Sequence, residues 1–501
     1  MRGIAAFGDN DAGWVDYQAK RPCQELVRKG DGTLELRMNL VAKPARLRTV
    51  HTIVLGFQAT PIKPMPKNWR LWTSGYAAPH AYRMVFGGAC IYWGCRNAFG
   101  DIYPRGHDFS IYKQFALTRK TGHVSQKFIA KWLKGYRKVS VAQAVRRYKG
   151  ALEGLFNGIA QNPHGLIITY TNAAAMRVDT RAGRTYLNEW DRHVYPTREY
   201  SFGQYWDFTV NPCRSFRDFA EWYYNKLLGT FDDCIYWDNM FLKSDFNTVL
   251  TNAYRLPDGY VQPATSLWDE RALVRRTAVL DTELHKPDLN MIHMTNTAIA
   301  PVLAFARIDL DLEDKYGSSP FQSRFSRAFL LTEAIGRQFG NVPVGLLGLF
   351  SKSPARLAWI QRTYAGVMLT LEIRGWEWDP VYAESLTRLM AFGYGMPSTK
   401  TWDYWRRNYP MRVYGDKTSS IVVAKRKGGQ AVVVVCDWGH GGMIRVRLNR
   451  AAVHLPGRLS VINMETKKNV RVTAGGEIVF HLKKDDFKML LVKAAGAEVG
   501  H

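Results

Sequence analysis

Hydrophobic and polar residues alternate with a period of two near the N-terminus, and this pattern predicts antiparallel β-strands. The alternation extends from about residue 24 to residue 56 and is clearest in the segment Thr33-Leu34-Glu35-Leu36-Arg37. A region of this length is too small for a β-sandwich of its own. The prolines Pro61, Pro64 and Pro66 then exclude a helix or a central strand and mark a domain boundary. We therefore expect residues 1–60 to be the end of an N-terminal β domain with its linker.

Strand-like and helix-like patterns alternate through residues 61–408, as in an α/β fold with a parallel sheet. The helix-like segments place apolar residues three and four positions apart, for example between Val141 and Ile159. Seven short apolar segments are strand candidates, and an eighth is expected to be irregular. The seven are Arg83 to Tyr92, Gly165 to Thr171, Cys234 to Asp238, Leu289 to Thr295, Leu303 to Asp311, Val342 to Phe350 and Val367 to Ile373. This region is therefore predicted to form a central (β/α)8-type barrel.

The period of two returns in residues 409–501. Ser420 to Lys425 and Ala431 to Cys436 are strand candidates on the two sides of a turn at Lys427-Gly428-Gly429. Because helical patterns are absent from this part of the sequence, it is predicted to be a small antiparallel β-sandwich. The predicted fold class is α/β, with a central barrel and flanking antiparallel β-sandwich elements.

Composition adds that the chain is globular. Its 501 residues are 46% hydrophobic and 13% aromatic, which is enough for several domains with large cores. No apolar run reaches the roughly 20 residues that cross a bilayer. The first residues, Met1 to Asp9, lack the apolar core of a signal peptide. A mature secreted chain and a chain without its natural beginning both fit this start.

Motifs for cofactors and metals are missing from the sequence. Its six cysteines include no CxxC pair, so neither a zinc ribbon nor a disulfide scaffold is indicated. Its twelve histidines include no HExxH, and neither GxGxxG nor GxxxxGK[ST] occurs. We expect no cofactor and no metal site.

The net charge of +26 is unusual, and part of it is concentrated between Phe109 and Leu152. Eleven basic residues lie there without any acidic residue: Lys113, Arg119, Lys120, Lys127, Lys131, Lys134, Arg137, Lys138, Arg146, Arg147 and Lys149. Aromatic residues such as Trp132 and Tyr136 are interspersed among them. Three interpretations are open: a solvated helix face, a site for an anionic polysaccharide, or a nucleic-acid surface.

Carboxylates follow two of the predicted barrel strands. Asp238 ends the apolar run Cys234-Ile235-Tyr236-Trp237. A second cluster ends another strand and consists of Asp309, Asp311, Glu313 and Asp314. Catalytic groups of (β/α) barrels sit at the carboxyl ends of strands, and two carboxylates on different strands are the catalytic pair of most glycoside hydrolases.

In a retaining glycosidase, Asp238 would attack the anomeric carbon and a carboxylic acid of the second cluster would protonate the leaving oxygen. Glu313 is the first choice for this acid and Asp311 the second. The alternatives are that Asp238 caps the next helix and that Glu313 is a solvated loop charge.

Sugar sites combine flat apolar faces with hydrogen-bonding groups, and both kinds of side chain follow the predicted strands. The candidates for substrate binding are Trp93, Trp237, Asn239, His293, Asn296, Trp376 and Glu377. The alternative for each aromatic residue is a place in the core, since Trp supplies much buried area in any domain. For His293, the alternative is a buried histidine whose hydrogen bonds are satisfied.

Several segments resemble the glycoside-hydrolase-like proteins whose N-terminal β domain is related to that of family 123. They cover nearly the whole chain: Phe57 to Pro64, Asn188 to Trp190, Ile235 to Asn239, Tyr254 to Tyr260, His293 to Asn296, Asp311 to Asp314, Val461 to Thr466 and Asp485 to Lys488. The resemblance implies a secreted glycoside hydrolase with a barrel and a closing β-sandwich.

One departure from these relatives concerns their adjacent Asp-Glu pair. In the barrel region such a pair occurs only as Asp269-Glu270, which opens the amphipathic segment Arg271 to Leu284 and is better explained by helix capping. Two functions are therefore carried forward. One is a glycoside hydrolase acting on a complex, possibly anionic, polysaccharide. The other is a non-catalytic carbohydrate-binding or assembly protein on a degenerate barrel.

Overall fold

The structure is a computed structural model, and it describes sixteen stretches of the chain. These are residues 3–15, 22–48, 50–73, 82–85, 110–134, 153, 156–161, 166–172, 175–177, 181–193, 200–202, 205–294, 297–314, 320–347, 353–375 and 379–494.

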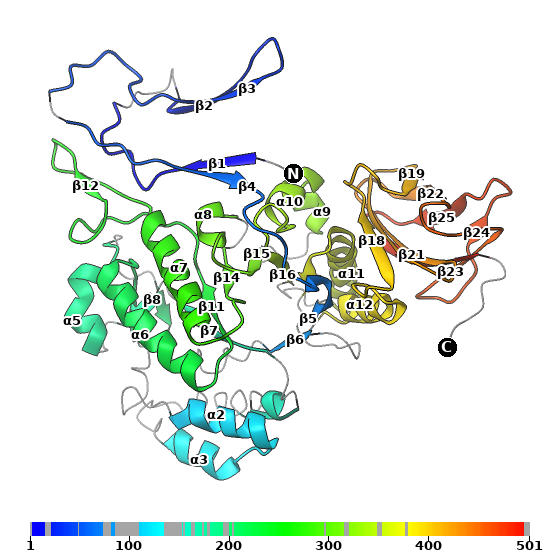
Figure 1. The fold of residues 1–501 in the computed structure, drawn as a ribbon, viewed down its shortest axis with the longest axis horizontal. Helices are drawn as coiled ribbons and strands as arrows, with labels where there is room; N and C mark the ends of the chain where they lie inside the picture. Colours follow the sequence, from blue (N-terminus) through cyan, green and yellow to red (C-terminus); the bar gives the residue numbers. More distant parts are fainter. Residues whose placement is uncertain are drawn as a thin grey trace.

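Eight parallel strands form the central sheet, and their order in the sheet follows their order in the chain (Figure 1). They are β5 (Trp72–Thr73), β6 (Tyr82–Val85), β7 (Leu166–Asn172), β11 (Cys234–Asp238), β14 (Met291–His293), β15 (Ile308–Asp314), β16 (Val342–Leu347) and β17 (Arg374–Gly375). The two edge strands of this sheet are β5 and β17. An ion pair joins the segments that precede them, with Arg70 Nε 2.6 Å from Glu372 Oε1. This topology confirms the predicted (β/α) barrel with flanking antiparallel sheets.

Helices surround the sheet and bury its outer face. The main ones are α2 (Ser110–Thr121), α3 (Gln126–Lys134), α5 (Arg181–Trp190), α6 (Arg214–Thr230), α7 (Leu267–Glu283), α8 (Ala300–Leu303), α9 (Phe321–Arg324), α10 (Arg327–Glu333), α11 (Pro354–Leu371) and α12 (Pro380–Phe392). Ser353 and Asp379 accept hydrogen bonds from backbone amides in the first turns of α11 and α12. Short hairpins in the connections are formed by β8 (Ala175–Arg177), β9 (Tyr200–Phe202), β10 (Tyr205–Thr209), β12 (Tyr254–Arg255) and β13 (Val261–Gln262).

One predicted strand is wrong. The segment Val367 to Ile373 forms mostly the end of α11, and the last barrel strand, β17, follows it. Residues at the end of α11 are buried on all sides, and such a run cannot be distinguished from a buried strand by periodicity. The strand predicted from Leu303 likewise begins later, at Ile308, because Leu303 ends α8.

Two antiparallel sheets form the C-terminal sandwich (Figure 1). One contains β18 (Thr399–Asp403), β20 (Thr418–Lys425), β21 (Gln430–Asp437), β26 (Phe487–Ala494) and β23 (Leu459–Asn463), and the other contains β19 (Met411–Tyr414), β22 (Gly442–Leu448), β25 (Ile478–Leu482) and β24 (Arg471–Val472). Alternate residues of β20 and β21 pack against the second sheet and against α11. The larger sheet therefore joins the sandwich to the barrel.

Near the N-terminus there are two antiparallel strand pairs, of which β2 and β3 lie in the predicted region of residues 24–56. β1 (Gly3–Phe7) pairs with β4 (Gly56–Thr60), and β2 (Gln24–Arg28) pairs with β3 (Leu34–Met38). Phe7 packs against Trp268 of α7 with 5.1 Å between the ring centroids, which attaches the first pair to the barrel. Among the helices that the structure describes, none is long and apolar enough to cross a membrane.

Candidate active site

Alternation along β11 directs Asp238 into the barrel. Cys234 and Tyr236 belong to the apolar cluster inside the strands, whereas Ile235 and Trp237 pack outward against the helices. Asp238 follows in phase with Tyr236 at the carboxyl end of the strand, where (β/α) barrels carry their functional groups.

The next residue, Asn239, binds both oxygens of Asp238. Its backbone amide donates to Oδ1 at 2.9 Å and its side-chain amide donates to Oδ2 at 3.0 Å. Asn239 has a φ of 59°, a left-handed conformation that asparagine adopts more readily than most residues. Asn239, predicted to bind substrate, therefore contacts the predicted catalytic carboxylate.

His293 at the end of β14 connects the two predicted catalytic carboxylates. Its Nδ1 lies 2.8 Å from Asp238 Oδ1, and its Nε2 lies 3.0 Å from Glu313 Oε2. The hydroxyl of Tyr236 lies 3.1 Å from the same Nδ1. Three neighbouring strands of the barrel, β11, β14 and β15, thus contribute to one hydrogen-bonded group.

A β-bulge in β15 directs Glu313 toward His293. The pairing of β15 with β16 shifts between Leu310 and Leu312, so that Asp311 has no counterpart on β16. Before the bulge Leu310 faces the barrel interior, and after it Leu312 packs outward. Glu313 consequently faces inward, whereas strict alternation would have directed it outward.

Electrostatics favour a charged imidazole between the carboxylates. Burial lowers the pKa of His293, but its hydrogen bonds to Asp238 and Glu313 and the charges of these groups outweigh that effect and raise the pKa to about 9. The side chains of Asp238 and Glu313 are 18% and 10% exposed, so both carboxylates reach solvent while the ring is nearly covered. The site places a buried imidazole between two partly accessible carboxyl groups.

Asp311, the second choice for the acid, lies in a different environment. Its residue is only 2% exposed. Burial raises its pKa to about 7, a rise opposed by a backbone hydrogen bond from Thr297 and supported by the charge of Glu333. Deeper in the same strand, burial and the charge of Asp311 raise the pKa of Asp309, and Lys63 opposes this. The structure groups Asp238 with Glu313 and leaves Asp311 less accessible.

The other predicted sugar contacts separate into two groups. Trp237 is fully buried and its indole donates to Tyr224 Oη at 2.9 Å, so it lies in the core and does not line the site. The remaining candidates lie outside the described residues: Trp93, Asn296, Trp376 and Glu377. Sequence reasoning missed Tyr236, although its position two residues before Asp238 on one strand would have indicated a shared face.

The predicted basic stretch is only partly described. Lys113, Lys127 and Lys131 are exposed on α2 and α3, whereas Arg119 forms an ion pair of 3.1 Å with Asp233. The residues from Arg137 to Lys149 lie outside the described part. An anionic glycan and a nucleic acid therefore both stay predictions for this segment.

The acidic pair Asp269-Glu270 lies in the first turn of α7, away from the His293 group. Asp269 forms an ion pair with Arg217, and Glu270 Oε1 lies 2.9 Å from the buried Arg192 guanidinium. Both acids therefore anchor α7 to its surroundings through arginines.

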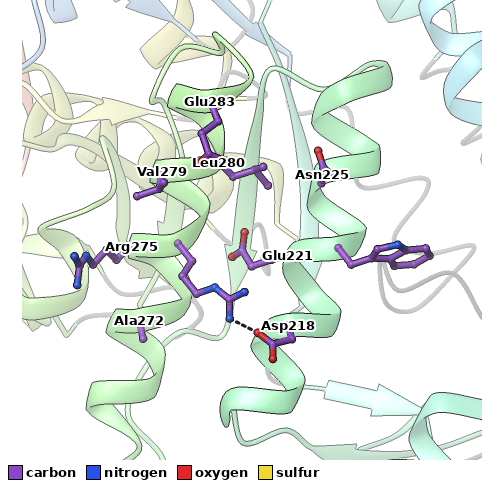
Figure 2. Close-up of a pocket in the computed structure, with 10 residues that line it drawn as sticks. Asp218, Glu221, Asn225, Ala272, Arg275, Val279, Leu280 and Glu283 are labelled. Atoms are coloured by element: carbon purple, nitrogen blue, oxygen red, sulfur yellow. Dashed lines mark hydrogen bonds and ion pairs between the residues drawn. The ribbon is translucent and has the colours of Figure 1, made fainter.

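A groove of about 550 Å³ lies between the outer helices α6 and α7 (Figure 2). Asp218 and Arg276 form an ion pair of 2.6 Å there, and Thr277 Oγ1 donates to Glu221 at 2.6 Å. The groove is lined by helix residues and contains no member of the His293 group. Within the described ranges, no cluster of His, Cys, Asp or Glu has an arrangement suited to a metal ion.

Comparison with known proteins gives matches only among solved structures, since no protein-family model and no curated protein matches the chain. A cycloisomaltooligosaccharide glucanotransferase from Paenibacillus sp. is 9% identical, with a TM-score of 0.43 over 67% of this chain and 74% of that one. A GH27 β-L-arabinopyranosidase from Geobacillus stearothermophilus is 8% identical, with a TM-score of 0.43 over 68% and 77%. A noncanonic maltogenic α-amylase from Thermotoga neapolitana is 12% identical, with a TM-score of 0.41 over 68% and 81%. These similarities concern the general course of the chain and identify no substrate.

Proposed function

We propose that the protein is a glycoside hydrolase whose catalytic carboxylates are Asp238 and Glu313. The observation that carries this proposal is the attachment of both carboxylates to the two nitrogens of one imidazole, at the carboxyl ends of neighbouring strands. Both are partly accessible, as groups that act on a large substrate must be. The resemblance to family 123 and the predicted polysaccharide substrate are part of this proposal.

The separation of the carboxylates favours inversion of the anomeric centre. One imidazole ring and two N···O contacts of 2.8 and 3.0 Å separate the oxygens that lie against His293. This span fits the range of about 6.5–9.5 Å, which leaves room for a water molecule, better than the range of about 5–5.5 Å in retaining enzymes. We therefore assign Asp238 as the base that activates water, in place of the nucleophile expected from the sequence.

Glu313 takes the role of general acid. It protonates the leaving oxygen while Asp238 accepts a proton from the attacking water on the other side of the sugar ring. Asn239 donates to both oxygens of Asp238 and so holds the base in a fixed orientation. The group from β11, β14 and β15 then contains the two functions that an inverting hydrolysis needs.

The test is product release from aryl glycosides and natural polysaccharides, including sulfated and uronic-acid-rich ones. We expect Asp238→Asn to lower turnover of every substrate by about 100-fold or more. Glu313→Gln should do so for polysaccharides but much less for aryl glycosides with an acidic leaving group, which need no general acid. Asp218→Asn, in the groove between α6 and α7, is the matched control and should leave turnover unchanged.

NMR of the first product identifies its anomeric configuration and so tests inversion directly. Tight glycan binding without release of any product, by the wild type and by all variants, would favour the alternative of a non-catalytic carbohydrate-binding protein.

A further inference from the structure

We propose that His293 is a positioning residue: its ring is the spacer that sets the separation between the base Asp238 and the acid Glu313. This inference rests on the proposed function and extends it, because it names the residue that determines the geometry of the catalytic pair. The ring contacts one carboxylate through each nitrogen, at 2.8 and 3.0 Å. No smaller side chain in its place would reach both.

The ring is fixed by its own surroundings. Its residue is 5% exposed, and Met291, which precedes it on the same face of β14, is completely buried. Tyr236 Oη contacts Nδ1 beside Asp238, so the edge of the ring that faces β11 has two partners. A ring confined in this way transmits its position to both carboxylates.

The described charged and titratable groups around the ring are acids and one phenol. Asp238 and Tyr236 approach it from β11, Glu313 approaches it from β15, and the charge of the ring acts on Asp311 of β15. Opposite charges at both nitrogens stabilise the imidazolium form, and burial strengthens their attraction. The positive charge of the ring in turn offsets the repulsion between the two carboxylates.

The short contact between Nε2 and Glu313 Oε2 also allows this residue to work as an acid. When the proton on Nε2 passes to Glu313 Oε2, the nitrogen becomes the acceptor and the carboxylic acid becomes the donor. The proton on Nδ1 stays on the ring and keeps its hydrogen bond to Asp238. Glu313 gives the proton that it received from Nε2 to the leaving oxygen, and Asp238 takes the proton of the attacking water. After the products leave, Asp238 releases its proton to solvent and Nε2 regains one from solvent, which restores the starting state.

The experiment removes the ring and supplies it again. We expect His293→Gly to lower kcat by about 100-fold or more, as misplacement by about 1 Å does, with KM changed little. Added imidazole, which fits the space that the variant leaves, should restore at least a tenth of the lost kcat. Asp218→Asn is the control, because this residue lines the groove between α6 and α7 and is no member of the His293 group. It should retain most of the activity.

A second measurement does not depend on turnover. NMR of the histidine ring, assigned by the absence of its signal in His293→Gln, should show an imidazolium at pH 7.5 in the wild type. In Glu313→Gln its pKa should fall by about one unit or more. A ring that is neutral at pH 7.5, or a His293→Gly variant with unchanged kcat, would overturn the inference. If the wild type is inactive but its ring titrates as expected, the proposed hydrolase function is refuted. The inference that His293 separates the two carboxylates then still stands.

Discussion

Glu372 links the segments before the first and last strands of the barrel. Removing its charge tests whether this contact holds the two edges of the barrel sheet together. It lies two residues before β17, and its carboxylate accepts two hydrogen bonds from Arg70, which lies two residues before β5. Arg337 donates a third at 2.7 Å and the hydroxyl of Tyr394 a fourth at 2.7 Å. The perturbation is Glu372→Gln, which keeps the size of the side chain.

The expected loss follows from burial. Glu372 is 1% exposed, and the guanidinium groups of Arg70, Arg337 and Arg374 lie within 6 Å of the single ring of Trp69, at 4.7, 4.2 and 5.3 Å. Without the anion these buried or half-buried cations lose their compensation. Breaking a buried ion pair costs about 3–5 kcal/mol, and we expect a loss of this size in the free energy of unfolding.

The assay is equilibrium unfolding in urea at pH 7, with hydrogen exchange at residues 372–375 to localise the effect. Glu384→Gln is the control, because that side chain is 72% exposed and its ion pair with Arg388 contributes less than about 1 kcal/mol. A loss below about 1 kcal/mol in Glu372→Gln, equal to that of the control, would refute the argument that this carboxylate closes the barrel.

The same reasoning predicts how the difference depends on pH. Burial would raise the pKa of Glu372, but the charge of Arg70, a hydrogen bond with Asp403 and the charge of Arg337 outweigh it and place the pKa well below its ordinary value. The stabilisation is therefore complete above the unfolded pKa of about 4.3 and is lost as the pH falls through the lower folded pKa. Wild type and Glu372→Gln should converge only in strong acid.

Two further predictions concern the sandwich and the site. Arg362 of α11 donates to Glu465 at 2.7 and 3.0 Å and to the Phe487 carbonyl at 2.8 Å, so Arg362→Ala should cost about 1–3 kcal/mol in urea unfolding. Glu384→Gln, whose side chain is exposed on α12, should cost far less. His293, with a pKa raised to about 9, stabilises the fold fully below its unfolded pKa of about 6.5 and loses this contribution as the pH rises through 9. The thermal midpoint should therefore fall between pH 7 and pH 10 more in the wild type than in His293→Gln, and equal falls would contradict the charged ring.

The parts of the fold that the sequence predicted are those in which local periodicity and burial agree. The strand Cys234–Asp238 and the strands of the sandwich each have a clear apolar pattern bounded by polar residues. The prediction failed for Val367 to Ile373 because a helix end buried between the barrel sheet and the sandwich is apolar on every side. Its burial depends on a sandwich strand more than 60 positions later, which no local window contains.

The candidate site shows the same limit in finer detail. The sequence marks three polar residues at strand ends: Asp238, His293 and Glu313. Their grouping, however, depends on one residue of β15 that has no pairing partner on β16. Alternation alone places Asp309, Asp311 and Glu313 on one face, away from the interior that Leu310 occupies. The bulge at Asp311 reverses the phase for the residues after it and so converts Glu313 from an outward charge into the partner of His293. Deletion of Asp311 would place Leu312 directly after Leu310, in the register with β16 that both residues already have. Glu313 should therefore still face His293 in that variant, and the contact between them should persist.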